Sequence, residues 1–175
     1  MTSNQNPMEI SGTDAVWQIV HRQLRACVDF DRFTSELEQC LGKFDASVMA
    51  VIMESPGEAR SLIEKMQGAQ DLMIFLALDH GRALNLVHKQ GKAMQYLIGN
   101  PLTAIQMTRH QMGAALYAPL RVLVYESTGG DCVVEYDQPS SLFGQFENPE
   151  VRRVGLSLDR KLAAVLQRAA ELANL

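Results

Sequence analysis

The segment that follows Pro119 most constrains the fold, because it has the pattern of two strands joined by a tight turn. Leu120–Glu126 and Cys132–Tyr136 are rich in valine and tyrosine, and the residues from Ser127 to Gly130 between them end in two glycines. Small residues and glycines are typical of hairpin turns, and strands joined by so short a turn pair antiparallel. We therefore predict a β-hairpin here, within a sheet that is largely antiparallel.

Apolar runs elsewhere predict the remaining strands. Apolar and polar residues nearly alternate over Val20–Val28, which indicates a half-buried strand, and residues 92–98 predict a further one. Leu72–Leu78 is apolar without alternation, which predicts a fully buried central strand, or alternatively a buried helix.

The last segment predicts a long amphipathic helix. Asn148 and Pro149 give a capped start, after which apolar residues recur with the 3.6-residue period of a helix. Together with the strands, the helices predict a single α+β domain over residues 14–175, with helices packed on one face of the sheet. Five shorter helices are also predicted. The first has Phe33, Leu37 and Leu41 as its buried stripe and ends at Gly42, and the second lies within residues 44–53. The third follows a capping box from Ser55 to Glu58, and the last two cover residues 83–88 and 102–110, the latter with Ile105 inward.

The composition favours a soluble, cytoplasmic protein. The chain has 175 residues, 47% of them hydrophobic, which suffices for one core. The net charge of -4, without a run of lysine or arginine, argues against nucleic acid as a partner. Three cysteines without paired spacing indicate a reducing compartment. No apolar run is long enough to span a membrane, and no segment resembles a signal peptide. The polar composition of residues 1–13 predicts a mobile tail.

Four motifs from Asp79 onward carry a family resemblance. They are Asp79-His80-Gly81, the IGNP sequence at Ile98–Pro101, Ala118–Glu126 and Val133–Leu142. In this order, and with the closing helix, they resemble the domain of unknown function 302 family over about residues 72–175. The resemblance implies a compact α+β fold that tends to form homodimers, and it brings no assigned activity. Residues 44–70 are longer than the opening that is usual in that family.

Asp79 and His80 are the candidate acid–base pair. They follow a predicted buried strand, where polar side chains often serve a site, and the carboxylate of Asp79 would orient the imidazole of His80. In the alternative interpretation Asp79 caps the following helix and His80 bonds the backbone.

Four further residues are candidate ligand-binding groups. Asn100 precedes Pro101 and either caps a helix or places its N-terminus at an anion or carbonyl group. Arg109 and His110 would hold an anion, and a soft metal bound by His110 with neighbouring methionines is disfavoured. Tyr136 either lines a pocket with its hydroxyl free or packs against the neighbouring strand.

These residues complete no known catalytic motif, so the sequence favours a homodimeric small-molecule or partner-binding module without catalysis, with a small anionic ligand as one candidate. The alternative is an enzyme in which His80, oriented by Asp79, is the acid–base group and Arg109 holds an anionic substrate. A haem or copper protein is a weaker third idea, and no cofactor or metal is predicted. The enzyme hypothesis requires His80 and Arg109 to face the same space.

Overall fold

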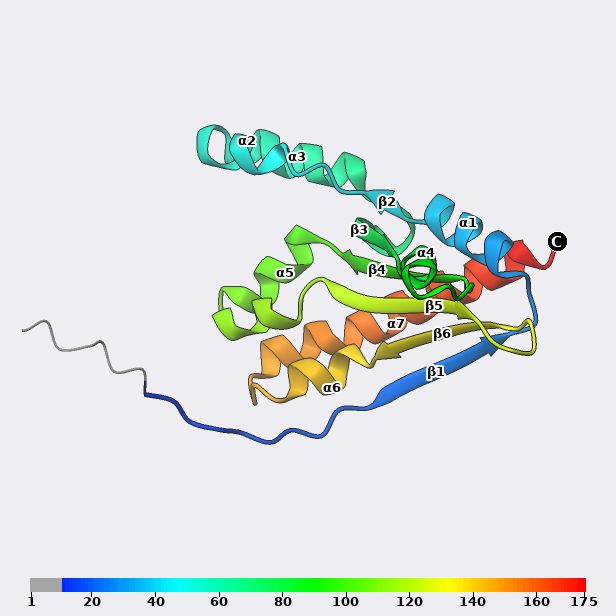
Figure 1. The fold of residues 1–175 in the computed structure, drawn as a ribbon. Helices are drawn as coiled ribbons and strands as arrows, with labels where there is room; N and C mark the ends of the chain where they lie inside the picture. Colours follow the sequence, from blue (N-terminus) through cyan, green and yellow to red (C-terminus); the bar gives the residue numbers. More distant parts are fainter. Residues whose placement is uncertain (1–10) are drawn as a thin grey trace, which may run out of the picture.

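A computed structural model describes residues 11–175, so most of the predicted tail, residues 1–10, lies outside the described residues. The sheet has six strands in the order β1-β6-β5-β4-β3-β2, and all neighbours are antiparallel except β2 and β3 (Figure 1). This confirms the predicted α+β domain with a largely antiparallel sheet. The strands are β1 His21–Ala26, β2 Gly42–Lys43, β3 Met73–Asp79, β4 Ala93–Gly99, β5 Leu120–Glu126 and β6 Cys132–Asp137.

The predicted hairpin is present as β5 and β6. Glu126 pairs with Cys132 at its tip, and the backbone N–H of Ser127 donates to the carbonyl oxygen of Asp131 at 2.9 Å. Gly130 at the turn has a φ of 86°, which glycine adopts without strain. The strict alternation of β5 then buries every second side chain, as a strand with one covered face requires.

Helices α1 and α7 cover the face of the sheet to which these buried side chains point. Both helices were predicted. In the structure the Asp29 side chain accepts from the N–H of Arg32 at the start of α1, and Asn148 accepts from the N–H groups of Glu150 and Val151 at the start of α7. Among the described residues, no helix is long and apolar enough to cross a membrane. The helices are α1 Phe30–Cys40, α2 Val48–Glu54, α3 Pro56–Met66, α4 His80–Ala83, α5 Pro101–Thr108, α6 Pro139–Gly144 and α7 Pro149–Ala173, with short 3-10 turns η1 Ala69–Asp71, η2 Leu84–Val87 and η3 Met112–Tyr117.

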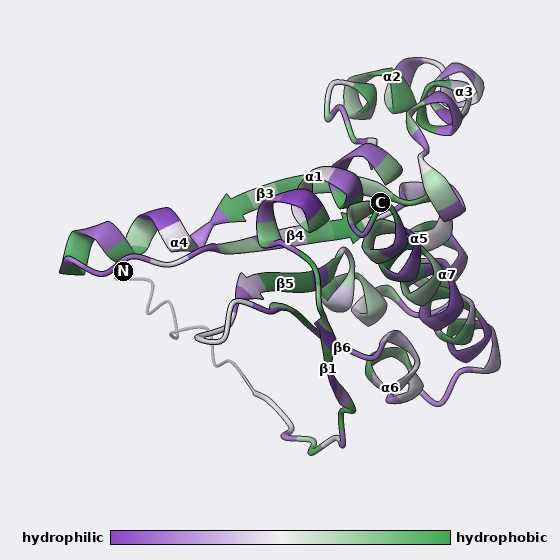
Figure 2. Ribbon diagram, turned by 90° about the vertical axis from the view of Figure 1, so that its right-hand side faces the viewer, coloured by the Kyte–Doolittle hydropathy of each residue, from purple (hydrophilic) through white to green (hydrophobic). Residues whose placement is uncertain are grey.

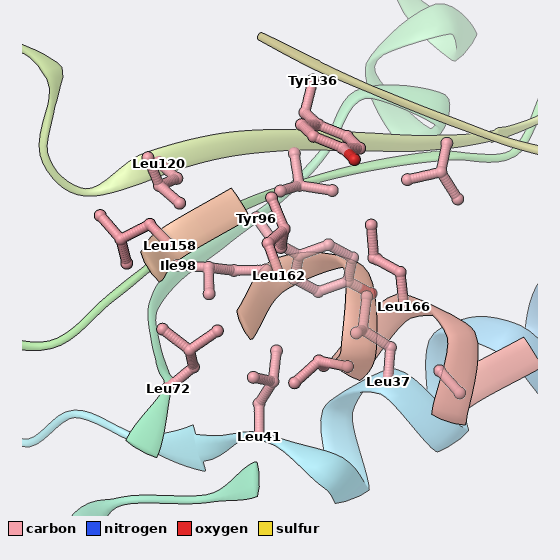
Figure 3. Close-up of a cluster of buried hydrophobic side chains, with 14 of the residues drawn as sticks. Leu37, Leu41, Leu72, Tyr96, Ile98, Leu120, Tyr136, Leu158, Leu162 and Leu166 are labelled. Carbon is pink, nitrogen blue, oxygen red and sulfur yellow. The ribbon is translucent and has the colours of Figure 1, made fainter. Parts of the chain in front are cut away.

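The main core lies between this face and the two helices. Figure 3 shows Leu37 of α1 and Leu162 of α7 packed with Tyr96 of β4. Tyr96 is completely buried, and its hydroxyl donates to Glu38 Oε1 at 2.9 Å. Burial raises the pKa of Tyr96 above the usual value for tyrosine, and the bond to Glu38 raises it further, so the hydroxyl stays protonated and continues to donate.

The predicted strand at Leu72–Leu78 forms as β3, but the prediction that it is central and fully buried was wrong. Strand β3 is next to the short edge strand β2, which pairs only with Met73 and Ile74. The rest of β3 therefore lies at an open edge, where Leu76 is 45% and Leu78 40% exposed.

Two further local predictions were wrong. Ile105 of α5 is 53% exposed, whereas Met107 two residues later is buried, so the helix turns a different side to the core. Ser55 makes no capping hydrogen bond with its side chain. Because Ser55 also ends α2, its N–H donates to Val51 at 2.8 Å and is not available to Glu58 for a capping box.

Helices α2 and α3 form a hairpin that projects from the sheet (Figure 1). We call residues 43–67 the arm. Its base is closed by Gly42 and Gly68, whose N–H groups both donate to the carbonyl oxygen of Leu72, at 3.0 and 3.1 Å. The arm has its own small core around Val48, Ala59 and Ile63, which reaches Met73 of the sheet.

Candidate functional site

The predicted site residues lie at two ends of the sheet. His80 follows Asp79, which pairs with Met94 at the start of β4, whereas Asn100 follows Gly99, which pairs with Met73 at the other end. A strand of seven residues is roughly 20 Å long. Figure 2 shows α4, which begins at His80, and α5, which ends just before Arg109, at opposite ends of β4. The structure therefore does not bring His80 and Arg109 into one site.

Asp79 and His80 do not hydrogen-bond each other in the described part of the chain. Asp79 Oδ1 accepts a hydrogen bond from the N–H of Arg82 at 2.7 Å and so caps α4. His80 Nε2 lies 3.1 Å from Gln95 Oε1, on the exposed side of β4. This arrangement matches the capping interpretation of Asp79, while His80 contacts a side chain instead of the backbone.

Asn100 is 5% exposed, and both the oxygen and the nitrogen of its side-chain amide form a hydrogen bond. Oδ1 accepts from the N–H of Leu102 at 2.8 Å, and Nδ2 donates to the carbonyl oxygen of Asp71 at 2.7 Å. Pro101 occupies the first position of α5, as predicted. Asn100 therefore serves as a helix cap and as a tie to the segment before β3.

Arg109 and His110 lie together in the exposed turn after α5. Arg109 Nε donates to His110 Nε2 at 3.0 Å, and both side chains are exposed. Met107 is buried in the core and Met112 is 73% exposed, so these methionines do not converge on His110. In the part of the chain that the structure describes, no group of three or more histidine, cysteine, aspartate or glutamate side chains is arranged to hold a metal ion.

Tyr136 lies on the covered face of β6 and is 9% exposed. It lines a groove between β1 and α7 that is separate from the other candidate residues. From the sequence, Tyr136 either lines a pocket or packs against the neighbouring strand. In the structure it pairs with Val122 of β5 and belongs to the core cluster (Figure 3). The residue also borders the groove.

Across the open face of the sheet, Glu135 joins three strands. Its carboxylate accepts hydrogen bonds from Gln23 at 2.6 Å and from the Tyr125 hydroxyl at 2.7 Å, and it lies 3.3 Å from His21 Nε2. The other ring nitrogen of His21 is 3.1 Å from Asp137. The hydrogen bond from Gln23 is the main reason why the pKa of Glu135 is lowered, and the bond to Asp137 is the main reason why the pKa of His21 is raised. Since these groups satisfy one another, the cluster holds β1 against β6.

A pocket with an almost wholly apolar lining lies at the other end of the sheet, where β4 turns into α5 and β5 begins. We call it the sheet-end pocket. It has a volume of about 370 Å³. Asn100 and Thr103 are its only polar side chains among the described residues. The rest of the lining comes from the arm, the sheet, α5, α6 and α7: Phe44, Met49, Phe75, Ile98, Gly99, Pro101, Ala104, Met107, Ala118, Pro119, Leu120, Phe143 and Leu158.

Small residues keep this pocket open. Gly99 faces it without a side chain, and a Cβ atom there would already touch Pro119 and Phe75 at 3.5 and 3.6 Å. Ala104 on α5 leaves space where a larger side chain would project. On the arm side, the rings of Phe44 and Phe75 stack with centroids 4.3 Å apart and form a rigid wall.

Sequence reasoning found Asn100 but missed the pocket around it. Three of the lining residues, Phe75, Phe143 and Leu158, come from β3, α6 and α7, and Phe44 comes from the loop after β2. Each looks like an ordinary core residue in its own segment. The one usable signal was the turn Gly99-Asn100-Pro101, because a glycine beside a capped helix start permits close approach.

The comparisons agree with the fold. A search of the curated proteins finds no match. The family model described as domain of unknown function DUF302 matches residues 48–169, so α2 and α3 lie inside the matched region. A solved structure described as an uncharacterized conserved DUF302 protein from Bacillus stearothermophilus is similar at a TM-score of 0.61 and 14% identity, over 85% of this chain and 97% of that chain. The predicted resemblance is confirmed: this chain belongs to the DUF302 family.

Proposed function

We propose that the protein binds a small, uncharged, largely apolar molecule in the sheet-end pocket. The observation that carries this proposal is a preformed space of about 370 Å³ with apolar walls and two polar side chains. Small-molecule sites typically have volumes of about 300–1,000 Å³ and a mainly apolar lining with a few placed polar groups. Apolar ligand surface that is transferred from water to such a lining contributes about 25 cal/mol of binding free energy per Å² buried.

The polar groups of the pocket favour an uncharged ligand. Asn100 bonds Leu102 through its amide oxygen and Asp71 through one of its amide N–H groups. Thr103 has a hydroxyl that makes no hydrogen bond to the described residues, so it can offer one bond to a ligand. A charged ligand in this pocket would lose its hydration without gaining an oppositely charged partner. The free energy of that desolvation is far larger than the gain from one hydrogen bond to a hydroxyl.

The lining of the pocket is the reason for proposing binding. Among the described residues it is made of apolar side chains with Asn100 and Thr103. The alternative enzyme needs His80 and Arg109 around one substrate, and their positions at opposite ends of β4 do not support it.

The pocket is tested with the uncharged fluorescent probe N-phenyl-1-naphthylamine. We expect saturable fluorescence enhancement with the natural sequence, and a loss of affinity of about tenfold or more in Ala104→Phe, because the phenyl ring occupies the space. Ala164→Phe is the matched control, since Ala164 is an exposed alanine of α7 that does not line the pocket. Equal binding by both variants would reject the proposal, provided that both keep the circular dichroism spectrum of the parent.

We also propose that the protein is a homodimer, as the family resemblance implies. The open edge of β3 supports this, because Leu76 and Leu78 are exposed there. In the 3-10 turn η2 that follows α4, Leu86 and Val87 are also 87% and 63% exposed. Two copies of one strand edge pair antiparallel about a twofold axis. Light scattering after size exclusion is expected to give twice the chain mass at micromolar concentration, and a monomer there would refute the dimer.

A further inference from the structure

A second groove lies between the edge strand β1 and the helix α7, about 610 Å³ in volume. Its floor is apolar and comes from both layers of the fold: Phe33 of α1, Val134 of β6 and Leu166 of α7. Leu24 of β1 also lines it and is 41% exposed, although its side chain is on the covered face of the sheet. A ligand with an apolar part would be stabilised here, because it would remove this apolar surface from water.

Tyr136 brings an unused hydrogen-bond donor into the groove. The side chain is 9% exposed, and its hydroxyl makes no hydrogen bond to the described residues. Every completely buried polar side-chain atom in that part of the chain does have a partner, so the Tyr136 hydroxyl is in reach of solvent or a ligand. Burial raises the pKa of this hydroxyl, which Arg22 opposes and Asp159 reinforces, so at neutral pH it is protonated and able to donate.

The charged groups around Tyr136 leave a surplus of donors. Arg22 donates from Nε and one terminal nitrogen to Gln138 Oε1, at 3.1 and 2.8 Å, and forms no ion pair with the described residues. A guanidinium has five N–H groups, so three remain. Each oxygen of Asp159 already accepts one hydrogen bond, from the N–H of Ser140 at 2.8 Å and from Gln138 Nε2 at 2.9 Å.

We infer that this groove binds an aliphatic carboxylic acid, with the carboxylate between the Tyr136 hydroxyl and the Arg22 guanidinium and the hydrocarbon chain along the floor from Leu24 to Leu166. Complementarity selects this class. The free donors of Tyr136 and Arg22 favour an acceptor, the charge of the Arg22 guanidinium favours an anion, and the apolar floor favours a hydrocarbon chain. A cationic amphiphile would face Arg22 and find the carboxylate of Asp159 already bonded. The site is distinct from the sheet-end pocket, whose described lining shares no residue with it.

The probe for this groove is decanoate, titrated into the full-length protein below its micelle concentration and followed by calorimetry and by amide shifts of β1 and α7. Decan-1-ol, which has the same chain without the charge, is the comparison. We expect decanoate to bind about tenfold tighter than decan-1-ol, because a hydrogen bond to a charged acceptor is stronger than one to a neutral acceptor.

Two variants test the carboxylate contacts. Tyr136→Phe keeps the ring in the core and removes only the hydroxyl, and Arg22→Gln removes the charge at an exposed position. Each is expected to weaken decanoate about tenfold and to leave decan-1-ol nearly unchanged. Arg32→Gln, at an exposed position of α1 outside the groove, is the matched control and is expected to bind decanoate like the parent.

The outcomes separate this site from the sheet-end pocket. The groove is supported as the decanoate site if Ala104→Phe binds decanoate like the parent and Tyr136→Phe binds it weakly. This conclusion does not depend on whether N-phenyl-1-naphthylamine binds in the sheet-end pocket. The inference is overturned if decan-1-ol binds as tightly as decanoate, if both groove variants bind like the parent, or if Ala104→Phe alone abolishes decanoate binding.

Discussion

The side-chain amide of Asn100 donates a hydrogen bond of 2.7 Å to the backbone carbonyl of Asp71. This bond joins the turn between β4 and α5 to the segment that leads into β3. Asp71 has a φ of 60°, an uncommon conformation for a residue other than glycine. Its carboxylate is also fixed, by Lys161 of α7 at 2.8 Å. The wall of the sheet-end pocket at Asn100 is therefore tied both to the start of β3 and to α7.

Asn100→Ala is expected to lower the free energy of unfolding by about 2 kcal/mol, because it removes the cap of α5 and leaves the carbonyl of Asp71 without its partner. Asn100→Asp separates the two roles. It keeps an acceptor for Leu102 but places a carboxylate beside the carbonyl oxygen of Asp71, so we expect a similar loss. Urea unfolding measures both, and an Asn100→Asp variant as stable as the parent would show that the bond to Asp71 is not needed.

Gly42→Ala and Gly68→Ala are each expected to lower the free energy of unfolding by about 3 kcal/mol. A Cβ atom on Gly42 would lie 1.8 Å from the carbonyl oxygen of Met66, and one on Gly68 would lie 2.2 Å from the backbone nitrogen of Gly42. Both contacts are with backbone, so no side-chain rotation relieves them. The base of the arm would have to open, which thermal unfolding would detect as a lower Tm.

Gly57→Ala is the matched control for these two glycines. Gly57 lies in the first turn of α3, and nothing is within 4 Å of a Cβ atom placed there. Alanine is favoured over glycine in a helix by up to about 1 kcal/mol, so this variant is expected to be slightly more stable than the parent. A loss of stability like that of Gly42→Ala would mean that any alanine in this region is harmful and that close packing is not the cause.

Asn148→Ala and Ser55→Ala compare two helix starts that look alike in sequence. Both residues precede a proline at the first helical position. Asn148 accepts from the N–H groups of Glu150 and Val151, so its loss is expected to cost about 1 kcal/mol. Ser55 forms no capping bond, and its replacement is expected to change stability by less than about 0.5 kcal/mol. Chemical denaturation of the pair measures the difference, and equal costs would contradict the observed caps.

The stability that His21 contributes is expected to depend on pH. Its pKa in the folded protein is raised above the ordinary value of 6.5, mainly by Asp137 and also by Glu135. A raised pKa means that the contribution is complete below the unfolded value and is lost as the pH rises through the folded value. Glu135, whose pKa is lowered from 4.5, loses its contribution in the opposite direction, as the pH falls through its folded value.

The comparison of the parent with His21→Gln isolates this effect. The difference in urea midpoint is expected to be larger at about pH 6 than at about pH 8.5, since the imidazolium is present only at the lower pH. Titration of the His21 ring protons by NMR checks the direction of the shift independently. A pKa at or below 6.5, or a midpoint difference that grows with pH, would contradict the contacts with the two carboxylates.

The structure explains which predictions from the sequence succeeded. The hairpin of β5 and β6, the cap of α5 at Asn100 and the cap of α7 at Asn148 were all predicted, because turn and cap chemistry involves residues a few positions apart. The capping box at Ser55 failed, even though its pattern was local, because the end of α2 had already used the N–H that the box requires. Local patterns therefore predicted elements well, except where two elements shared a residue.

The sequence by itself determined the elements, the hairpin, the covering helix α7 and the family. Only the tertiary structure decided that β3 lies beside a two-residue edge strand, which exposes Leu76 and Leu78. It also decided that His80 and Arg109 are at opposite ends of β4, and that residues far apart in the sequence line a pocket beside Asn100. Periodicity and capping report on neighbours along the chain, whereas strand order, exposed edges and cavities arise from contacts between residues far apart in sequence, and no single segment encodes them.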